Sequence, residues 1–313
     1  MTGAANVNSF YLQMCFSFFL LLFVPHGVRA ESNFTVEAAT SKIEATVTDD
    51  SLHIPDVQLK QWVQKAADAV VAYYGRFSVP HLTLQIRSFK GRGVRGGQTF
   101  PRYGGFIRIA VGSETTQEDL ASDWMLTHEM VHLAFPNMQE QHHWIEEGLA
   151  TYVEPIARIQ AGQFSAARMW FELVRDMPKG LPQSGDEGLD HTHTWGRTYW
   201  GGALFCFLAD VEIRKQTQNK KGLQDALRGI LDAGGDMRYD WPIEKALQTG
   251  DRAVAVEVLM KLYEQMRDHP MQVDLDSLWK QLGIRVEHDA AQFNHDAPLA
   301  KIREAITAPK PGS

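Results

Sequence analysis

Two histidines four residues apart, His128 and His132, constrain what this chain can fold into, with Glu129 directly after the first. Met130 and Val131 between them are apolar, so the segment predicts a largely buried helix. Helical spacing of four residues places both imidazoles on one face, one turn apart, where they can bind a single metal ion. The same pattern alone is also compatible with a buried amphipathic helix that carries incidental histidines, so further ligands must be sought.

A catalytic zinc site has three protein ligands and keeps a fourth position for water or substrate. We expect the third ligand on a following helix, and the segment from Trp144 to Ala150 offers two adjacent candidates, Glu146 and Glu147. Glu129 projects at about 100° from His128 around the helix, so it can contact a metal-bound water without occupying the metal. These residue types therefore predict metal-assisted hydrolysis with Glu129 as general base.

The arrangement resembles the gluzincin metallopeptidases, and particularly relatives of the M1 aminopeptidases. In that family HExxH is followed by a segment W-x-x-E-G-hydrophobic-A, which here reads WIEEGLA over 144–150. The resemblance implies that Glu147, which precedes the glycine, binds one Zn²⁺ per chain together with His128 and His132. Glu146 is the alternative ligand. A metzincin pattern is excluded, because Phe135 and Met138 stand where it requires glycine and histidine.

A second match follows in the segment RTYWGGALF, residues 197–205. It looks like the aminopeptidase segment in which a tyrosine, followed by x-x-Gly-Ala, points its hydroxyl at the scissile carbonyl. The resemblance implies that Tyr199 stabilises the oxyanion with zinc; the alternative is a core tyrosine with a satisfied hydroxyl. The family's G-x-M-E-N signature is missing, because residues 102–106 read RYGGF without an acidic side chain. The aminopeptidase subtype is therefore not implied.

The resemblance covers residues 100–210 and implies an α+β fold: a thermolysin-like zinc peptidase domain, in which a small mixed sheet precedes catalytic helices, with a mostly helical C-terminal region. Hydrophobic periodicity predicts where these elements lie. Strands are expected at 34–48 (as a strand or hairpin), 81–89 and 106–111, the last able to bind an extended peptide by edge pairing. Helices are expected at 55–77, 116–135, 144–159, 164–177 and 195–216, with later breaks near 234–235, 250 and 270. His142 and His143 are interpreted as loop residues or as supports for the ligands.

The glycine-rich stretch 91–105 contains GRGVRG, which matches GxGxxG. A dinucleotide site needs a helix to open there, but Gly97, Thr99 and Pro101 follow instead, so we interpret the stretch as a flexible loop.

Residues 10–24 form an almost entirely apolar run, followed by Pro25 and by the small-residue cleavage pattern Val28-Arg29-Ala30. This predicts a signal peptide over 1–30 and an exported protein, periplasmic or secreted, with no stable membrane span after cleavage. An uncleaved N-terminal anchor is the alternative, since no basic residue precedes the run. Cys15 lies within this segment, which leaves Cys206 without an intramolecular partner, as a buried small hydrophobe.

The order of the expected strands and helices divides the remaining chain into three parts. These are 31–112, the N-terminal α/β part of the peptidase domain; 113–216, the catalytic helical part with the zinc site; and 217–313, a C-terminal helical region. The formal net charge of −7 over 313 residues offers no basic surface for nucleic acid. We therefore expect a zinc metallopeptidase acting on a peptide or protein. The alternatives are an inactive binding module with the same fold, or a zinc hydrolase of a non-peptide amide.

Overall fold

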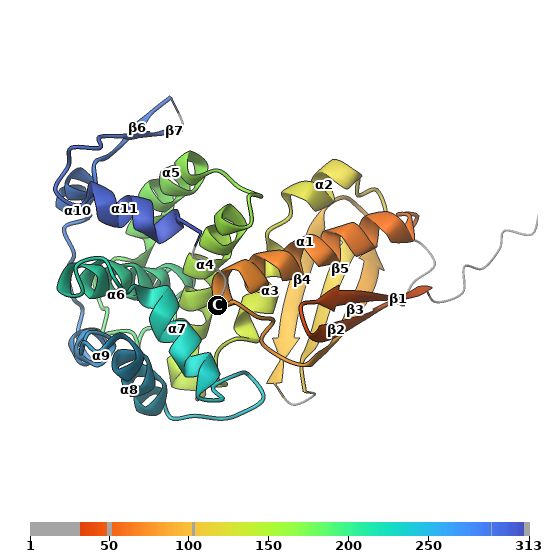
Figure 1. Ribbon diagram of the computed structural model, residues 1–313, viewed down its shortest axis with the longest axis horizontal. Helices are drawn as coiled ribbons and strands as arrows, with labels where there is room; N and C mark the ends of the chain where they lie inside the picture. The colour runs from red at the N-terminus through yellow and green to blue at the C-terminus, as the bar shows by residue number, and fades with distance from the viewer. Residues whose placement is uncertain (1–31, 49–51, 102–103, 289, 310–313) are drawn as a thin grey trace, which may run out of the picture.

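The computed structural model describes residues 32–48, 52–101, 104–288 and 290–309. The predicted signal segment over 1–30, with Cys15, lies outside the described residues. The fold is α+β: a five-stranded sheet occupies one half of the molecule and helices fill the other half (Figure 1). Within the described ranges, no helix combines the length and the apolar character that a membrane crossing requires.

The sheet is mixed, with strand order β1-β2-β3-β5-β4. Its outer pairs β1/β2 and β4/β5 are antiparallel, while β2/β3 and β3/β5 are parallel. Helix α1 connects β2 to β3 and buries Trp62, Val63 and Val70. The predicted hairpin, the predicted first helix and the two predicted strands that follow are confirmed. Their bounds are β1 Ser32–Ala38, β2 Ser41–Val47, α1 Asp56–Tyr74, β3 His81–Phe89, β4 Val94–Phe100 and β5 Phe106–Gly112.

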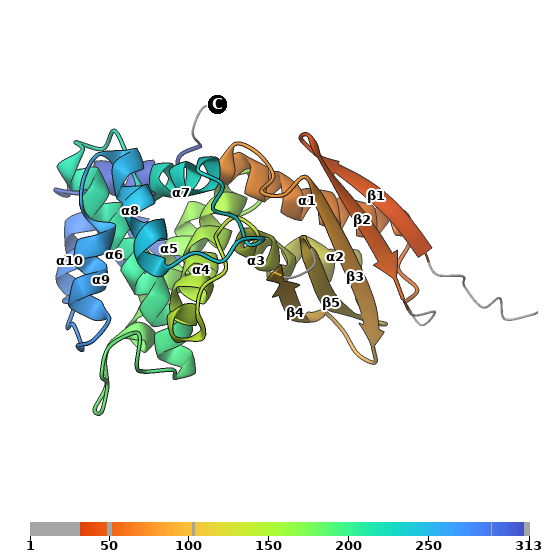
Figure 2. The same cartoon turned by 90° about the horizontal axis from the view of Figure 1, so that it is seen from below.

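The glycine-rich stretch predicted as a flexible loop instead contains β4, which forms the edge of the sheet nearest the helices (Figure 2). Its register shifts between Arg95 and Gln98, and Gly96 has φ 57°. Glycines inside a strand commonly mark such a bulge rather than a loop. The expectation that residues 106–111 form an edge strand is also wrong, because β5 is paired on both sides.

The single helix predicted over 116–135 is in fact two, α2 Gln117–Ser122 and α3 Met125–His132. The break lies at Asp123, whose carboxylate accepts hydrogen bonds from the backbone N–H groups of Met125 (3.0 Å) and Leu126 (3.2 Å). The indole of Trp62 on α1 donates to the same carboxylate at 2.9 Å. Asp123 thus caps α3 and fixes it against α1, so the histidine pair begins one turn into a short, anchored helix.

The predicted helices over 144–159 and 164–177 are confirmed as α4 His143–Gln160 and α5 Ala166–Asp176, followed by a short turn η3 Met177–Gly180. The helix predicted over 195–216 begins with a π-helical segment, η4 Gly196–Gly201, and continues as α6 Gly202–Gln216. Cys206 on α6 is buried, as expected. Helix α3 contacts the sheet, α4 packs on α3, and α6 packs on α4.

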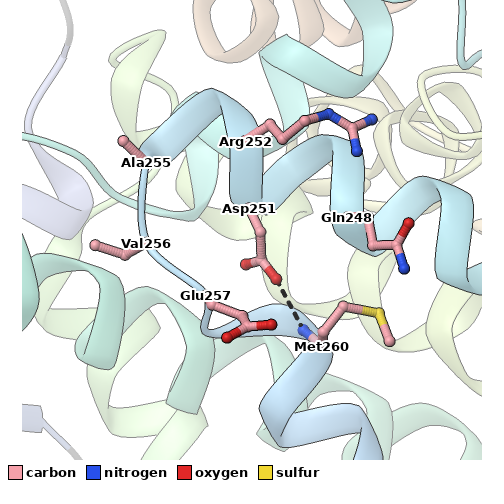
Figure 3. A pocket seen from close by; sticks show the side chains of 7 residues that line it. All are labelled: Gln248, Asp251, Arg252, Ala255, Val256, Glu257 and Met260. Atoms are coloured by element: carbon pink, nitrogen blue, oxygen red, sulfur yellow. Dashed lines mark hydrogen bonds between the residues drawn. The ribbon is translucent and has the colours of Figure 1, made fainter.

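The C-terminal region is helical with one small hairpin that the sequence did not predict. The predicted breaks near 234–235 and 270 are confirmed, but Gly250 lies inside α8, where it allows close packing on Leu259 of α9. The carboxylate of Asp251 on α8 accepts from the backbone N–H of Met260 on α9 at 3.0 Å (Figure 3). The elements are α7 Leu223–Asp232, α8 Ile243–Val254, α9 Leu259–Met266, α10 Leu275–Leu282, β6 Ile284–Glu287, β7 Ala290–Phe293 and α11 Ala300–Thr307.

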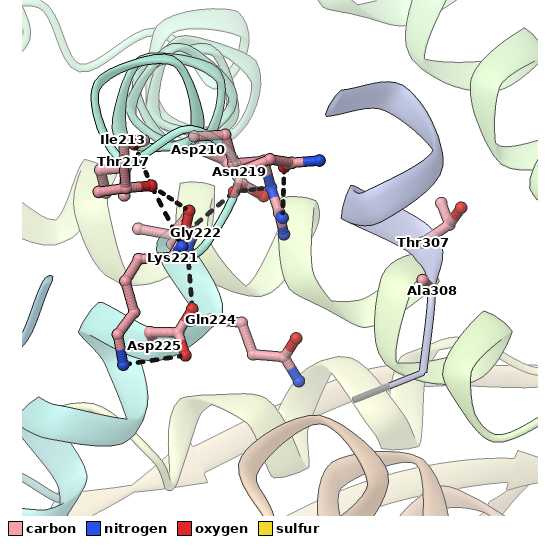
Figure 4. Close-up of polar contacts among 12 residues, drawn as sticks. Asp210, Ile213, Thr217, Asn219, Lys221, Gly222, Gln224, Asp225, Thr307 and Ala308 are labelled. Carbon is pink, nitrogen blue, oxygen red and sulfur yellow. Dashed lines mark hydrogen bonds and ion pairs between the residues drawn. The ribbon is translucent and has the colours of Figure 1, made fainter. Parts of the chain in front are cut away.

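A polar junction orients α7 against α6 and α1. Asp210 on α6 accepts from the backbone N–H of Leu223 (2.9 Å), and Asp225 accepts from that of Gly222 (2.8 Å) (Figure 4). The side chains of Gln224 and Arg228 then donate to the carbonyl of Tyr73 at the end of α1, at 2.6 and 2.8 Å. The C-terminal helices are thereby joined to the helix that covers the sheet.

Candidate metal centre

Helices α3 and α4 bring His128, His132 and Glu147 together. Oε2 of Glu147 lies 3.2 Å from Nε2 of His128 and 3.6 Å from Nε2 of His132. The side chains are 7%, 9% and 12% exposed, so the group is nearly dry. No other group of three potential metal-binding side chains was found among the described residues.

The spacing of these atoms fits zinc. Two ligand atoms at about 2.0–2.1 Å from Zn²⁺ in a tetrahedral arrangement are roughly 3.3–3.4 Å apart, and the two observed separations bracket that value. Two imidazoles and one carboxylate also match the ligand set of catalytic zinc sites. Glu146 points elsewhere: its Oε1 accepts from the backbone N–H of Met138 at 3.1 Å. The geometry therefore favours Glu147 over Glu146.

His143, at the start of α4, supports Glu147. Its Nε2 lies 3.3 Å from Oε1 of Glu147, the oxygen that does not face the histidine pair. Hydrogen bonds to Glu146 and Glu147 raise the pKa of His143 to about 10. Burial raises the pKa of Glu147, but its bonds to His128, His132 and His143 outweigh burial and hold the carboxylate ionised. His142, in contrast, is buried against Asp190 at 3.0 Å and takes no part in this group.

Glu129 is buried against β4 rather than against another helix. The hydroxyl of Thr99 lies 2.6 Å from Oε2 of Glu129 and 3.0 Å from its backbone oxygen. A Cβ on Gly97 would lie 2.6 Å from Oε1 of Glu129, so the carboxylate occupies the space that the missing side chain leaves. The edge strand therefore fixes the position of this carboxylate beside the two histidines.

Tyr199 reaches the same place from the π-helical segment η4, an irregularity that often marks functional sites. Its ring is stacked on that of His128, with centroids 6.5 Å apart and 19° between the planes. Burial, followed by the charges of Glu147 and Glu129, raises the pKa of Tyr199 to about 12. The phenol is therefore protonated at neutral pH and available as a hydrogen-bond donor.

Two glycines set the distance between Tyr199 and Glu147. Gly148 follows Glu147 on α4, Gly202 opens α6, and the two backbones touch. A Cβ on Gly148 would lie 2.1 Å from the carbonyl carbon of Gly202, and one on Gly202 would lie 2.0 Å from the carbonyl oxygen of Trp144. Any side chain at this crossing would separate the two helices. The glycines of the segments 144–150 and 197–205 thus allow α4 and α6 to pack closely at this crossing.

Two cavities meet at this centre. The first, of about 580 Å³, is lined by Gly97–Thr99 of β4 and by His128, Glu129, His132, Glu147 and Tyr199. The second, of about 710 Å³, extends from His128, Trp124 and Tyr199 between α4 and α5. We call it the α4–α5 cavity. Its wall includes Glu154, which is buried and bonded to Arg158 at 2.8 Å.

Stability should depend on pH through Glu154. Burial raises the pKa of Glu154 from 4.5 to about 7, against the effect of Arg158. The folded state therefore favours the protonated form: its stabilising contribution is complete below about pH 4.5 and is lost as the pH rises through about 7. Relative to Glu154→Gln, the parent should lose on the order of 3 kcal/mol of unfolding free energy across this window. Urea unfolding of both proteins at pH 5 and pH 8 checks this, and a pH-independent difference would contradict it.

Removal of one histidine should remove the metal. His132→Ala leaves two protein ligands where a catalytic zinc site uses three. We expect the parent to retain about one equivalent of zinc after dialysis and the variant to retain about a tenth or less. His191→Ala is the control, because His191 is exposed and bonded to Asp268. Full zinc content in His132→Ala, measured by elemental analysis, would show that His132 is not a ligand.

The fold is similar to that of solved M1-type zinc peptidases. An aminopeptidase N family protein from Idiomarina loihiensis matches with a TM-score of 0.63 at 11% sequence identity, over 82% of this chain and 50% of its own. A mutant M1 zinc metallopeptidase from Deinococcus radiodurans matches with a TM-score of 0.51 at 11% identity, over 78% of this chain and 53% of its own. The chain thus spans about half the length of the structures it matches. No protein-family model and no curated protein sequence matches it.

Structural neighbours at this level of sequence identity show a similarity of fold alone. Sequence reasoning had placed His128, Glu129, His132, Glu147 and Tyr199 in one site, and the structure brings all five to one cavity. Thr99 was missed because its strand was interpreted as a loop. The signal that could have found it is the Gly96-Gly97 pair, which marks both a bulge and a close approach.

Proposed function

We propose that the protein is a zinc-dependent peptidase that hydrolyses peptide bonds with activated water. One observation carries the proposal: His128, His132 and Glu147 converge at zinc-like spacing, and the carboxylate of Glu129 and the phenol of Tyr199 line the same cavity. If the two histidines were incidental residues of a buried helix, there would be no reason for α4 to place a third ligand beside them or for β4 to hold a carboxylate there. The similarity of the fold to zinc peptidases supports the same reaction class.

Zinc in such a site supplies Lewis acidity, which makes water acidic near neutral pH and polarises a carbonyl. Glu129 takes a proton from the attacking water while the water oxygen bonds to the carbonyl carbon. It then delivers that proton to the leaving nitrogen as the C–N bond breaks. The phenol of Tyr199 donates a hydrogen bond to the carbonyl oxygen while negative charge develops there. The products are a carboxylic acid and an amine.

An extended substrate can lie along β4. The outer edge of this strand has no strand partner among the described residues, and Gly97–Thr99 line the cavity of the metal centre. Pairing of a peptide with a sheet edge, in a thermolysin-like arrangement, would place one of its carbonyls near Tyr199. No residue from Val94 to Phe100 is acidic, so β4 offers no carboxylate for a free terminal amine. Blocked peptides are therefore included among the substrates to be tested.

The test measures zinc content and peptide cleavage together. Purified protein is analysed for metal, treated with a chelator, reloaded with zinc, and incubated at each stage with a mixed library of free and N-acetylated peptides. We expect one zinc per chain, cleavage that the chelator abolishes, and recovery on reloading. Bound zinc without any cleavage would favour an inactive binding module. Cleavage of small non-peptide amides alone would favour the other hydrolase.

Thr99 should affect turnover through Glu129. Thr99→Val keeps the shape but removes the hydroxyl that donates to Oε2 of Glu129. Hydrogen bonds to charged groups contribute about 1.5–3 kcal/mol, so we expect kcat to fall roughly tenfold, with KM and zinc content unchanged. Thr99→Ser restores the donor and should recover most of the rate. A parental kcat in Thr99→Val would show that the contact has no role in turnover.

Export is also proposed, on the apolar run and cleavage pattern over residues 1–30. N-terminal sequencing of the protein recovered from its native host checks the cleavage after Ala30. The division at 31–112, 113–216 and 217–313 is likewise proposed as a functional division, with the metal ligands all in the middle part.

A further inference from the structure

The α4–α5 cavity is large, and it opens directly at the metal centre. It shares His128, Trp124 and Tyr199 with the cavity of the metal centre. Thr151, which lines it, lies one helical turn after Glu147 on α4. Its volume of about 710 Å³ lies within the range of pockets that bind small molecules or large side chains. A group that enters this cavity is therefore adjacent to a bond cut at the metal centre.

Aromatic rings form the entrance of the cavity. Trp195 is 60% exposed and Trp124 is 49% exposed, although both are large apolar side chains. The ring of Trp195 is stacked on that of Tyr199, with centroids 5.8 Å apart, and Trp124 contacts His128 edge to face. Farther in, Met169 and Leu173 of α5 are buried and form an apolar wall. Exposed indoles that border an apolar cavity offer a surface on which a flat ring can pack.

The carboxylates that line the cavity are outnumbered by cations: Glu154, Glu172 and Asp176 stand against Arg158, Arg168, Arg175 and Lys179. Each carboxylate there is already paired with a cation that lines the same cavity, so a basic substrate side chain would find no unpaired acid. The ammonium of Lys179 also lies over the rings of Trp195 and Trp200, at 5.8 and 5.9 Å. The pairs are Glu154 with Arg158 (2.8 Å), Glu172 with Arg168 (2.6 Å), and Asp176 with both Lys179 (2.8 Å) and Arg175.

We propose that the α4–α5 cavity binds an aromatic side chain of the substrate, on a residue that flanks the bond to be cut. The inference rests on the proposed peptidase function and adds a substrate class to it. The aromatic entrance and the apolar wall favour a large, flat apolar side chain, and the pairing of every carboxylate in the lining disfavours a basic one. Even one methylene changes enzyme specificity by about 10- to 200-fold, so a cavity of this size should distinguish phenylalanine from alanine clearly.

The test uses blocked peptides that are identical except at one position on either side of the scissile bond, which carries Phe, Ala, Glu or Lys. We expect kcat/KM to be at least about tenfold higher for Phe than for the other three. Thr151→Trp places a large side chain in the cavity and should remove this preference, measured as the ratio of kcat/KM for the Phe and Ala peptides. Preference for Glu or Lys, or none, would overturn the inference.

A second variant guards against misfolding of Thr151→Trp. Trp195→Ala removes an exposed wall of the cavity and should reduce the Phe-to-Ala ratio several-fold. Tyr239→Ala is its control, because Tyr239 is similarly exposed (52%) and does not line the cavity. An unchanged ratio in Trp195→Ala, with the parental ratio also in Thr151→Trp, would overturn the inference.

A binding measurement separates this inference from the proposed function. Calorimetry with the zinc-loaded Glu129→Gln variant compares the dissociation constants of the Phe and Ala peptides without turnover. At least tenfold tighter binding of the Phe peptide supports the cavity assignment, whether or not the parent cuts it. Equal binding overturns the assignment, even if the parent proves to be an active peptidase.

Discussion

Glu129→Gln should abolish nearly all turnover while leaving the metal in place. The amide has the same shape and can still accept the hydrogen bond from Thr99, so the fold around Gly97 should persist. An amide cannot take a proton from water at neutral pH, however, and general base catalysis contributes about 10²- to 10⁴-fold. We therefore expect kcat to fall by about that factor, with zinc content and KM close to parental values.

The matched control for this variant is Glu146→Gln, the same chemical change on the neighbouring helix. Glu146 accepts from the backbone of Met138 through Oε1, which glutamine can also do. Its activity should stay within a few-fold of the parent. If Glu129→Gln retained parental turnover, the base would have to be another group, and the proposed mechanism would be wrong.

Gly148→Ala should cause the largest loss of stability among conservative changes near the site. The added Cβ would lie 2.1 Å from the carbonyl carbon of Gly202 and 2.2 Å from its Cα. Both are backbone atoms and cannot rotate away, so α4 and α6 must separate. Overpacking in a core typically costs 1–3 kcal/mol and sometimes more; against a backbone we expect at least about 3 kcal/mol.

Urea unfolding of Gly148→Ala and of a control, Thr151→Val, measures this loss. Thr151 is one turn along the same helix, is only partly buried, and keeps its size on replacement, so the control should lose much less stability than Gly148→Ala. In folded Gly148→Ala, kcat should also fall, because Tyr199 moves with the start of α6. A variant as stable and as active as the parent would show that the crossing tolerates a side chain.

The five site residues were predictable because their motifs are local. His128, Glu129 and His132 need only helical periodicity, and the segments around Glu147 and Tyr199 carry glycines at fixed positions. The strands at 81–89 and 106–111 were predictable for a similar reason, because period-two alternation is a local signal of a half-buried strand. The order of the strands in the sheet is not local, so β5 was taken for an edge.

The errors lie where tertiary contacts override local propensity. Glycine is generally disfavoured in strands, but the glycines of β4 allow a bulge and leave space for the carboxylate of Glu129. The prediction of one helix over 116–135 missed the break at Asp123, whose carboxylate accepts a hydrogen bond from Trp62 of α1, far away in sequence. Gly250 was taken for a helix end, although it allows Leu259 to pack closely. Each case depends on a partner that no short window of sequence contains.

The bonds from α7 to the carbonyl of Tyr73 limit how far this molecule could be reduced. A carbonyl at the end of a helix lacks an intrahelical partner, and here Gln224 and Arg228 supply its donors. A fragment that stopped after Gln216 would lose both donors and uncover the apolar flank of α6. A fragment that began at 113 would lose Thr99 and with it the support of Glu129. A minimal scaffold for transplanting this metal centre would therefore have to keep segments from both ends of the chain.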